Sequence, residues 1–201
     1  MSFKKKIFFL FFFFSTNIFA LEVENIVSIN NKIITNIDLD NEIEIIKIIN
    51  KNKNLEENYL NKLAISNLVN DEIKLLEVKK EKITIEEKNL NNYLNVFFKN
   101  LEINEKQIKK KYVNLIKKKI KIDLGWKQII DKEYKWKINI NMMEINKKIY
   151  EQNKGMNSTN TETIKILKEN MIRNEKEKKL LVYENFHLNK KKKIYLIKYY
   201  K

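Results

Sequence analysis

The stretch Ile26-Val-Ser-Ile-Asn-Asn-Lys-Ile-Ile-Thr35, followed by an isoleucine-rich run to Ile49, decides the fold of this chain. Two short β-branched segments, Ile26–Ile29 and Lys32–Ile34, flank Asn30-Asn31. Because asparagine tolerates a positive φ, this pair suits the two-residue turn of a β-hairpin. A lone hairpin is only marginally stable in water. A later part of the chain is therefore expected to cover it.

A repeated capping pattern marks where helices begin. Thr35 stands three residues before Asp38, so its hydroxyl can cap a helix while the carboxylate lies in the first turn. Further pairs have the capping-box spacing or its asparagine variant, in which the first side chain accepts a hydrogen bond from the N3 amide. These pairs are Asn54 with Glu57, Thr84 with Glu87, Asn104 with Gln107, Asn141 with Glu144, and Thr159 with Glu162.

Apolar periodicity predicts a mainly helical fold with a small antiparallel sheet. Helices are expected at about residues 36–50, 55–80, 85–100, 105–112, 114–134, 142–152 and 162–190. The helix at 55–80 is the longest of the early elements, and Ile65, Val69 and Ile73 widen its apolar stripe, which is typical of a central core helix. Residues 136–140 alternate briefly and are expected to be extended. The closing segment 194–199 is β-branched and aromatic, so we expect it to join the hairpin as a third strand.

Composition excludes most enzyme chemistry. The chain has 201 residues with no cysteine, so it has no disulfide framework, thiolate nucleophile or zinc-thiolate site. Its two glycines, Gly125 and Gly155, are isolated and cannot form a phosphate-binding loop. One histidine cannot build a multi-histidine metal site. The acid–base candidates Asp123, Glu133 and Glu144 are scattered. We expect no catalysis, no cofactor and no metal.

The formal net charge of +15 has two interpretations. The basic runs Lys109–Lys111, Lys117–Lys119 and Lys190–Lys193 are scattered, with acidic residues between them. This distribution favours a solvated surface, and no nucleic-acid partner is expected. The alternative is an anionic partner such as membrane headgroups.

Residues 1–20 are expected to be a secretory signal peptide. Lys4–Lys6 form a positive n-region, Ile7–Phe14 an apolar core, and Ala20 a small residue at a plausible cleavage point. The alternative is an uncleaved anchor. Ser15–Asn17 interrupt the apolar run well short of the ~20 residues that a spanning helix needs, so export is favoured.

After this leader, residues 21–201 are expected to form a single domain. Residues 21–152 would be its core, and residues 162–201 would complete it with a helix and a strand. Residues 153–161 are small, polar and weakly patterned, which is typical of a linker.

Three motifs and their order carry a resemblance to a known family. They are residues 27–39, a long helix that ends at 71–77, and residues 82–87; residues 170–200 then supply a late helix and strand. Together they resemble the N-terminal chaperone domain of SurA-type periplasmic proteins, which a C-terminal helix and strand complete. In that family, parvulin-type prolyl isomerase domains of about 100 residues occupy the place of residues 153–161. No histidine precedes His187, so the parvulin histidine pair is absent. A surface or capping role is expected for His187.

The resemblance implies an ATP-independent periplasmic holdase. Its partners would be unfolded outer-membrane proteins or other extended, aromatic-rich polypeptides, which need an exposed apolar groove. The alternatives are a peripheral protein on anionic membranes and a vestigial isomerase-family member without its catalytic domain. Oligomeric state stays open. Each candidate groove residue could instead fill the core, so a site requires several of them exposed side by side. The candidates are Tyr93, Phe97, Phe98, Trp126, Tyr134 and Trp136.

Overall fold

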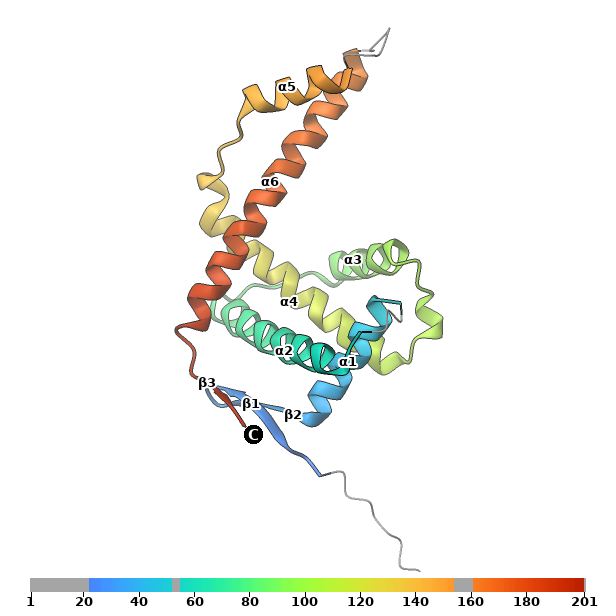
Figure 1. The fold of residues 1–201 in the computed structure, drawn as a ribbon, viewed down its shortest axis with the longest axis vertical. Coiled ribbons are helices and arrows are strands. Elements are labelled where there is room, and N and C mark those ends of the chain that lie inside the picture. Colours follow the sequence, from blue (N-terminus) through green and yellow to red (C-terminus); the bar gives the residue numbers. More distant parts are fainter. Residues whose placement is uncertain (1–21, 52–54, 154–160, 201) are drawn as a thin grey trace, which may run out of the picture.

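The computed structural model describes residues 22–51, 55–153 and 161–200, and it confirms the mainly helical fold with a three-stranded sheet (Figure 1). Short 3-10 helices lie at Glu105–Gln107 and Lys135–Lys137. The elements are β1 (Asn25–Ile29), β2 (Lys32–Thr35), α1 (Asn36–Ile49), α2 (Glu57–Lys80), α3 (Glu87–Asn100), α4 (Lys110–Tyr134), α5 (Met142–Asn153), α6 (Thr161–Lys192) and β3 (Ile197–Tyr199).

The molecule consists of a body and an arm. The sheet, α1 to α4 and the C-terminal part of α6 form the body, whereas α5 and the N-terminal part of α6 project from it as the arm (Figure 1). With 32 residues, α6 is about 48 Å long at 1.5 Å per residue. One helix therefore links the tip of the arm to the sheet.

The sheet joins the two ends of the described chain, as predicted. Its order is β2-β1-β3, and both strand pairs are antiparallel. In the hairpin turn, Asn30 takes the positive φ of 49°. The third strand is shorter than predicted, because the backbone around Ile194 still closes the end of α6 with a bond from its N–H to the carbonyl of Lys191. Beyond it, the Asn30 N–H donates to Leu196 O at 2.8 Å, and the Tyr200 N–H donates to Ile26 O at 2.9 Å.

Two of the predicted caps are confirmed. The Thr35 hydroxyl accepts from the Asp38 N–H, and the Asp38 carboxylate accepts from the Thr35 N–H at 2.9 Å, which is a complete capping box. At the start of α5, Asn141 Oδ1 accepts from the N–H groups of Met143 at 3.1 Å and Glu144 at 3.2 Å. These bonds satisfy amides that have no partner inside the helix.

Other predicted boundaries are wrong. Thr84 does not cap α3, because the chain stays extended through Glu86 and the helix begins two residues late, without a side-chain cap. Asn104 accepts from Lys106 N, but it caps only a 3-10 helix, and α4 then starts at Lys110. The expected extended stretch at 136–140 begins instead inside the second 3-10 helix. Asn54, Thr159 and most of the expected linker lie outside the described residues, as does the expected signal peptide.

Three helices are each followed by a left-handed residue that is not glycine. Lys51, Lys82 and Glu102 follow α1, α2 and α3 with φ values of 48°, 52° and 50°. After α2 the Lys82 N–H donates to Lys79 O and the Ile83 N–H donates to Val78 O, both at 3.1 Å. This is the Schellman pattern, in which a left-handed residue closes the helix end. A side chain with a Cβ is strained in that conformation.

Lys82→Gly is therefore expected to stabilise the protein. Relief of the left-handed strain outweighs the extra entropy that glycine gives the unfolded chain, for a net gain of about 0.5–1 kcal/mol. Urea unfolding would measure it. In the control, Lys79→Gly places glycine at a helical position and should destabilise. Equal effects of the two substitutions would contradict the argument.

Three apolar clusters fill the body. The largest lies between the sheet, α2, α4 and α6; the second joins α1, α3 and α4; and the third joins α1 and α2. Helix α4 passes close to α2 at Gly125, where an added Cβ would lie 2.9 Å from both γ carbons of Val78. Glycine thus permits the close approach of the two longest body helices. The largest fully buried side chains are Val27, Ile29, Ile73, Leu90, Ile116 and Trp126.

Candidate functional site

The six aromatic candidates do not form one groove. Trp126 is fully buried and Tyr134 nearly so, in the cluster beneath the sheet, whereas Phe98 is buried in the separate cluster under α3. Phe97 packs at the edge of that second cluster. The remaining two, Tyr93 and Trp136, are exposed on different elements. The predicted six-residue groove is wrong in this structure, because the apolar faces of α3 and α4 are turned inward.

His187 is also placed differently from the prediction. It is buried, not on the surface, and its Nδ1 lies 2.8 Å from the hydroxyl of Tyr134. The rings of Trp126 and Tyr134 meet the imidazole edge to face, at centroid distances of 5.2 and 5.5 Å. Tyr183 stacks on Tyr134 at 4.9 Å. The reason for the error is that α6 turns its 187–188 face into the body. These side chains hold α6 against α4.

A charged cluster continues this contact toward β3. The carboxylate of Glu77 accepts from the hydroxyl of Tyr195 at 2.6 Å and pairs with Lys191 at 2.7 Å. Burial alone would raise the pKa of Glu77, but the hydrogen bonds from Lys191 and Tyr195 outweigh it and lower the pKa. Burial and the bond to Glu77 raise the pKa of Tyr195. The cluster fastens α2, α6 and the segment before β3 together.

The burial of His187 predicts a pH-dependent stability. Burial first, and then the charge of Lys191, lower its pKa below the ordinary 6.5 against the opposing charges of Glu77 and Glu133. The folded state therefore disfavours the protonated ring, while the unfolded chain takes up the proton near pH 6.5. Stability should be full above that pH and fall as the pH drops from 6.5 toward the lower folded pKa. It is the one histidine of the chain, so urea midpoints between about pH 7.5 and 5.5 report it. His187→Phe should flatten the profile, and an unchanged slope would refute the assignment.

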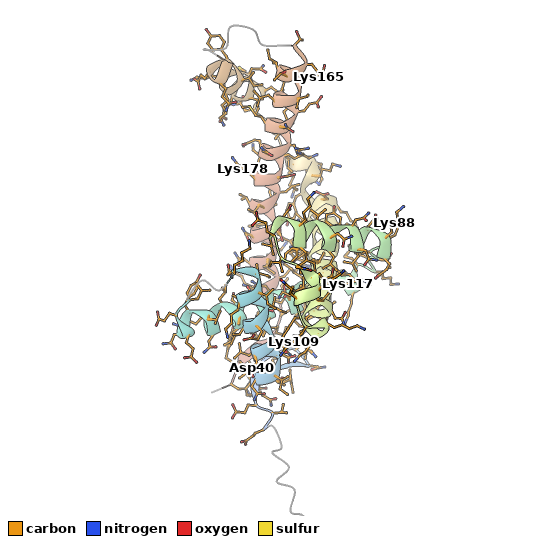
Figure 2. All side chains as sticks on the ribbon, turned by 90° about the vertical axis from the view of Figure 1, so that its right-hand side faces the viewer. Asp40, Lys88, Lys109, Lys117, Lys165 and Lys178 are labelled. Carbon is orange, nitrogen blue, oxygen red and sulfur yellow. The ribbon has the colours of Figure 1, made fainter. Side chains whose placement is uncertain are left out.

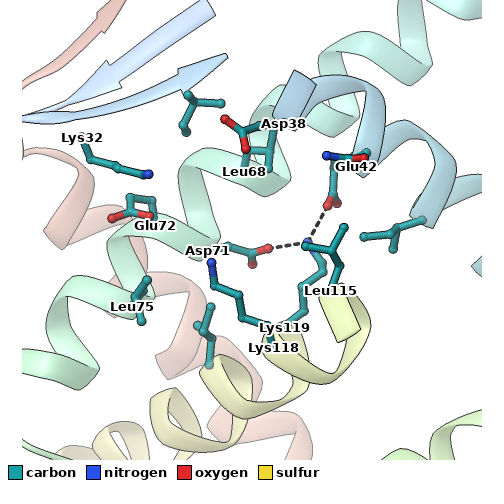
Figure 3. A pocket seen from close by; sticks show the side chains of 14 residues that line it. Lys32, Asp38, Glu42, Leu68, Asp71, Glu72, Leu75, Leu115, Lys118 and Lys119 are labelled. Atoms are coloured by element: carbon teal, nitrogen blue, oxygen red, sulfur yellow. Dashed lines mark hydrogen bonds and ion pairs between the residues drawn. The ribbon is translucent and has the colours of Figure 1, made fainter. Parts of the chain in front are cut away.

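A second charged cluster joins α1, α2 and α4. Lys119 lies between two carboxylates, pairing with Glu42 at 2.8 Å and with Asp71 (Figure 3). Asn67 donates to the second oxygen of Glu42 at 3.0 Å. Burial lowers the pKa of Lys119, but the charges of Asp71 and Glu42 outweigh it and raise the pKa. Burial raises the pKa of Asp71 even though Lys119 opposes the change. The adjoining cavity has a volume of ≈ 130 Å³, below the ≈ 300 Å³ of typical small-molecule sites. We therefore assign a structural role to this cluster.

Part of the basic charge is paired with carboxylates of the same chain. Lys117 pairs with Glu87, Lys119 is enclosed as described, and Lys191 pairs with Glu77. Figure 2 shows the labelled lysines spread over both the body and the arm, from Lys109 to Lys165. The labelled lysines therefore do not gather in one place.

A groove between α4 and α6 is the best-formed candidate for binding a polypeptide. Its walls come from residues that recur every three or four positions, so each helix contributes one face. The volume of ≈ 580 Å³ lies within the range of binding sites. Leu181 is 57% exposed and offers apolar surface directly to solvent. The lining residues are Lys127, Ile130, Asp131, Asn174, Glu177, Lys178, Leu180, Leu181 and Glu184.

An ion-pair bridge fixes the body end of this groove. Lys74 of α2 reaches Asp123 of α4 at 2.8 Å and Glu184 of α6 at 3.5 Å. Sequence reasoning missed the groove because charged residues outnumber apolar ones among the residues that line it. The only available signal was the pair Leu180-Leu181 next to a charged stretch of α6.

The acid–base candidates do not converge. Asp123 pairs with Lys74, and Glu144 pairs with Lys148 at 2.6 Å along α5, while Glu133 lies exposed on α4. Within residues 22–51, 55–153 and 161–200, no three metal-ligating side chains come together, and no helix is both long and apolar enough to cross a membrane.

The chain matches no protein-family model and no curated protein. The function is therefore argued from the groove and the surfaces around it.

Proposed function

We propose that this protein is an ATP-independent holdase that binds unfolded outer-membrane proteins in the periplasm. The observation that carries the proposal is the groove between α4 and α6, which presents Leu181 and the edges of Ile130 and Leu180 between charged rims. An apolar floor with polar rims suits a polypeptide segment that is not yet folded. The client class and the location follow from the resemblance to SurA-type proteins and from the expected signal peptide.

Apolar side chains on and near the arm extend the surface offered to a client. Trp136, Met143 and Tyr150 are 75%, 81% and 67% exposed, at the base of the arm and along α5. Methionine and tryptophan adapt to varied apolar partners at little geometric cost. Both signs of charge line the groove, with Lys127 and Lys178 beside the carboxylates of Asp131, Glu177 and Glu184 in its lining. Such a mixed rim favours tolerance of different clients over selection of one sequence.

A light-scattering assay tests the proposal. A urea-denatured outer-membrane β-barrel protein is diluted with and without the purified protein, in the absence of nucleotide. We expect aggregation to be suppressed at near-stoichiometric amounts. Leu181→Glu, which places a charge on the groove floor, should weaken the suppression severalfold because apolar client surface would meet a carboxylate.

The chain offers a matched control on the same helix. Val182 is 67% exposed but does not line the groove, so Val182→Glu should leave the suppression unchanged. No suppression by the unaltered protein at about tenfold excess would refute the holdase proposal. Equal losses of suppression in Leu181→Glu and Val182→Glu would show that the groove is not where the client binds. Sedimentation with anionic vesicles at low and high salt tests the membrane alternative, which the dispersed lysines support less well.

A further inference from the structure

The outer edge of β3 offers unpaired backbone groups. Leu196 and Tyr200 direct their backbone groups to β1, as their bonds with Asn30 and Ile26 show. In an antiparallel ladder the hydrogen-bonding direction alternates from one residue to the next, so Lys198 also faces β1 while its two neighbours face the opposite way. The N–H and C=O groups of Ile197 and Tyr199 therefore point away from the sheet, and they bond to no other described backbone group. Such an edge can accept an added strand.

A pocket lies directly beside this edge, between β3 and α2. Its volume is ≈ 330 Å³, which accommodates an aromatic side chain. The apolar part of its lining comes from Ile65, Val69, Ile197 and Tyr199, and the polar part comes from Lys62, Ser66 and Lys192.

The two lysines give the pocket its charge preference. Neither Lys62 nor Lys192 forms an ion pair with any residue that the structure describes, and no carboxylate lines the pocket. By contrast, Lys191, the residue before Lys192, pairs with the carboxylate of Glu77. An anionic group beside an apolar side chain is the ligand that would satisfy both features.

We propose that the channel between β3 and α2 binds the C-terminal end of an extended polypeptide whose last side chain is aromatic. The peptide adds a strand to β3 through Ile197 and Tyr199, its final ring enters the pocket, and its terminal carboxylate pairs with Lys62 and Lys192. Strand addition with capture of the carboxylate combines two established modes of peptide recognition. This inference rests on the proposed function, and it assigns a second polypeptide site that is separate from the groove on α6.

Fluorescence anisotropy with a labelled peptide tests the site. The probe alternates threonine and valine and ends in phenylalanine with a free carboxylate; a second probe ends in the carboxamide. Since a hydrogen bond to a charged group contributes more than a neutral one, we expect the acid to bind about tenfold more tightly. The variant K62Q/K192Q should lose that difference. The control K88Q/K165Q removes the same charge from two exposed lysines of α3 and α6 (Figure 2) and should keep it.

A third probe tests the added strand itself. Two versions of the peptide are N-methylated at alternate residues, one at the odd positions and one at the even positions. Only one of them loses the amides that would face β3, so only that version should bind more weakly. Equal affinities for the acid and the amide, or no response to K62Q/K192Q, would overturn the inference. So would equal affinities of the two N-methylated versions. The two proposals can fail separately. If the peptide results overturn this site but aggregation is still suppressed in a way that depends on Leu181, the proposed function stands without it.

Discussion

A chain that ends at Lys193 is expected to lose most of its stability. The truncation removes β3, so β1 loses one of its two partners and the apolar faces of Tyr195 and Ile197 leave the main cluster. It also removes the hydroxyl that donates to the buried carboxylate of Glu77. Full burial of a large side chain contributes about 1.5–3 kcal/mol, and these two partly buried side chains contribute a share of that each. A lost hydrogen bond to a charged group adds about 1.5–3 kcal/mol. With the ladder bonds of β3, the sum is a large part of the stability of a typical domain.

Urea unfolding followed by circular dichroism measures this loss. Leu196→Ala is the matched control within the same segment, because Leu196 is 73% exposed and its removal should change stability by less than about 0.5 kcal/mol. A truncated chain with an unchanged unfolding midpoint would contradict the role of β3 in closing the fold.

Lys119→Met is expected to cost about 3 kcal/mol of folding free energy. The substitution keeps the length of the side chain but leaves the carboxylates of Glu42 and Asp71 without their shared cation. Removing one partner of a buried ion pair costs about 3–5 kcal/mol, and the lower end applies because Lys119 and Asp71 retain some exposure. Lys118→Met, which removes the neighbouring lysine that forms no ion pair with a described residue, should have little effect.

The pH dependence of this variant provides an independent check. Burial already raises the pKa of Asp71 with Lys119 present, and removal of the cation should raise it further. A carboxyl group whose folded pKa lies above its unfolded value gains stability as the pH falls. The deficit of Lys119→Met should therefore shrink between neutral pH and about pH 5. Adding Asp71→Asn should also recover part of the loss. A deficit that grows on acidification would refute the assignment.

Local signals in the sequence determined the framework of the fold. The hairpin around Asn30, the capping box of Thr35 with Asp38, and the helix periodicity all depend on contacts within a few residues. The closing strand was also predictable, because a hairpin needs a cover and the last β-branched segment could supply it. Thr84 failed as a cap because the end of the preceding helix fixed the chain, and the left-handed Lys82 carries no glycine signal.

Only the tertiary structure decided which side chains serve the core and which face solvent. The sequence of α4 does not show whether its aromatic side chains face solvent or another helix. In the structure, Trp126 and Tyr134 are covered by α6, where both contact His187. Lys119 became the centre of a charged cluster through Glu42, 77 positions away. The groove between α4 and α6 and the pocket beside β3 likewise combine residues far apart in the chain. Periodicity gives a helix its apolar face, but the partner opposite that face is set by packing across the whole fold.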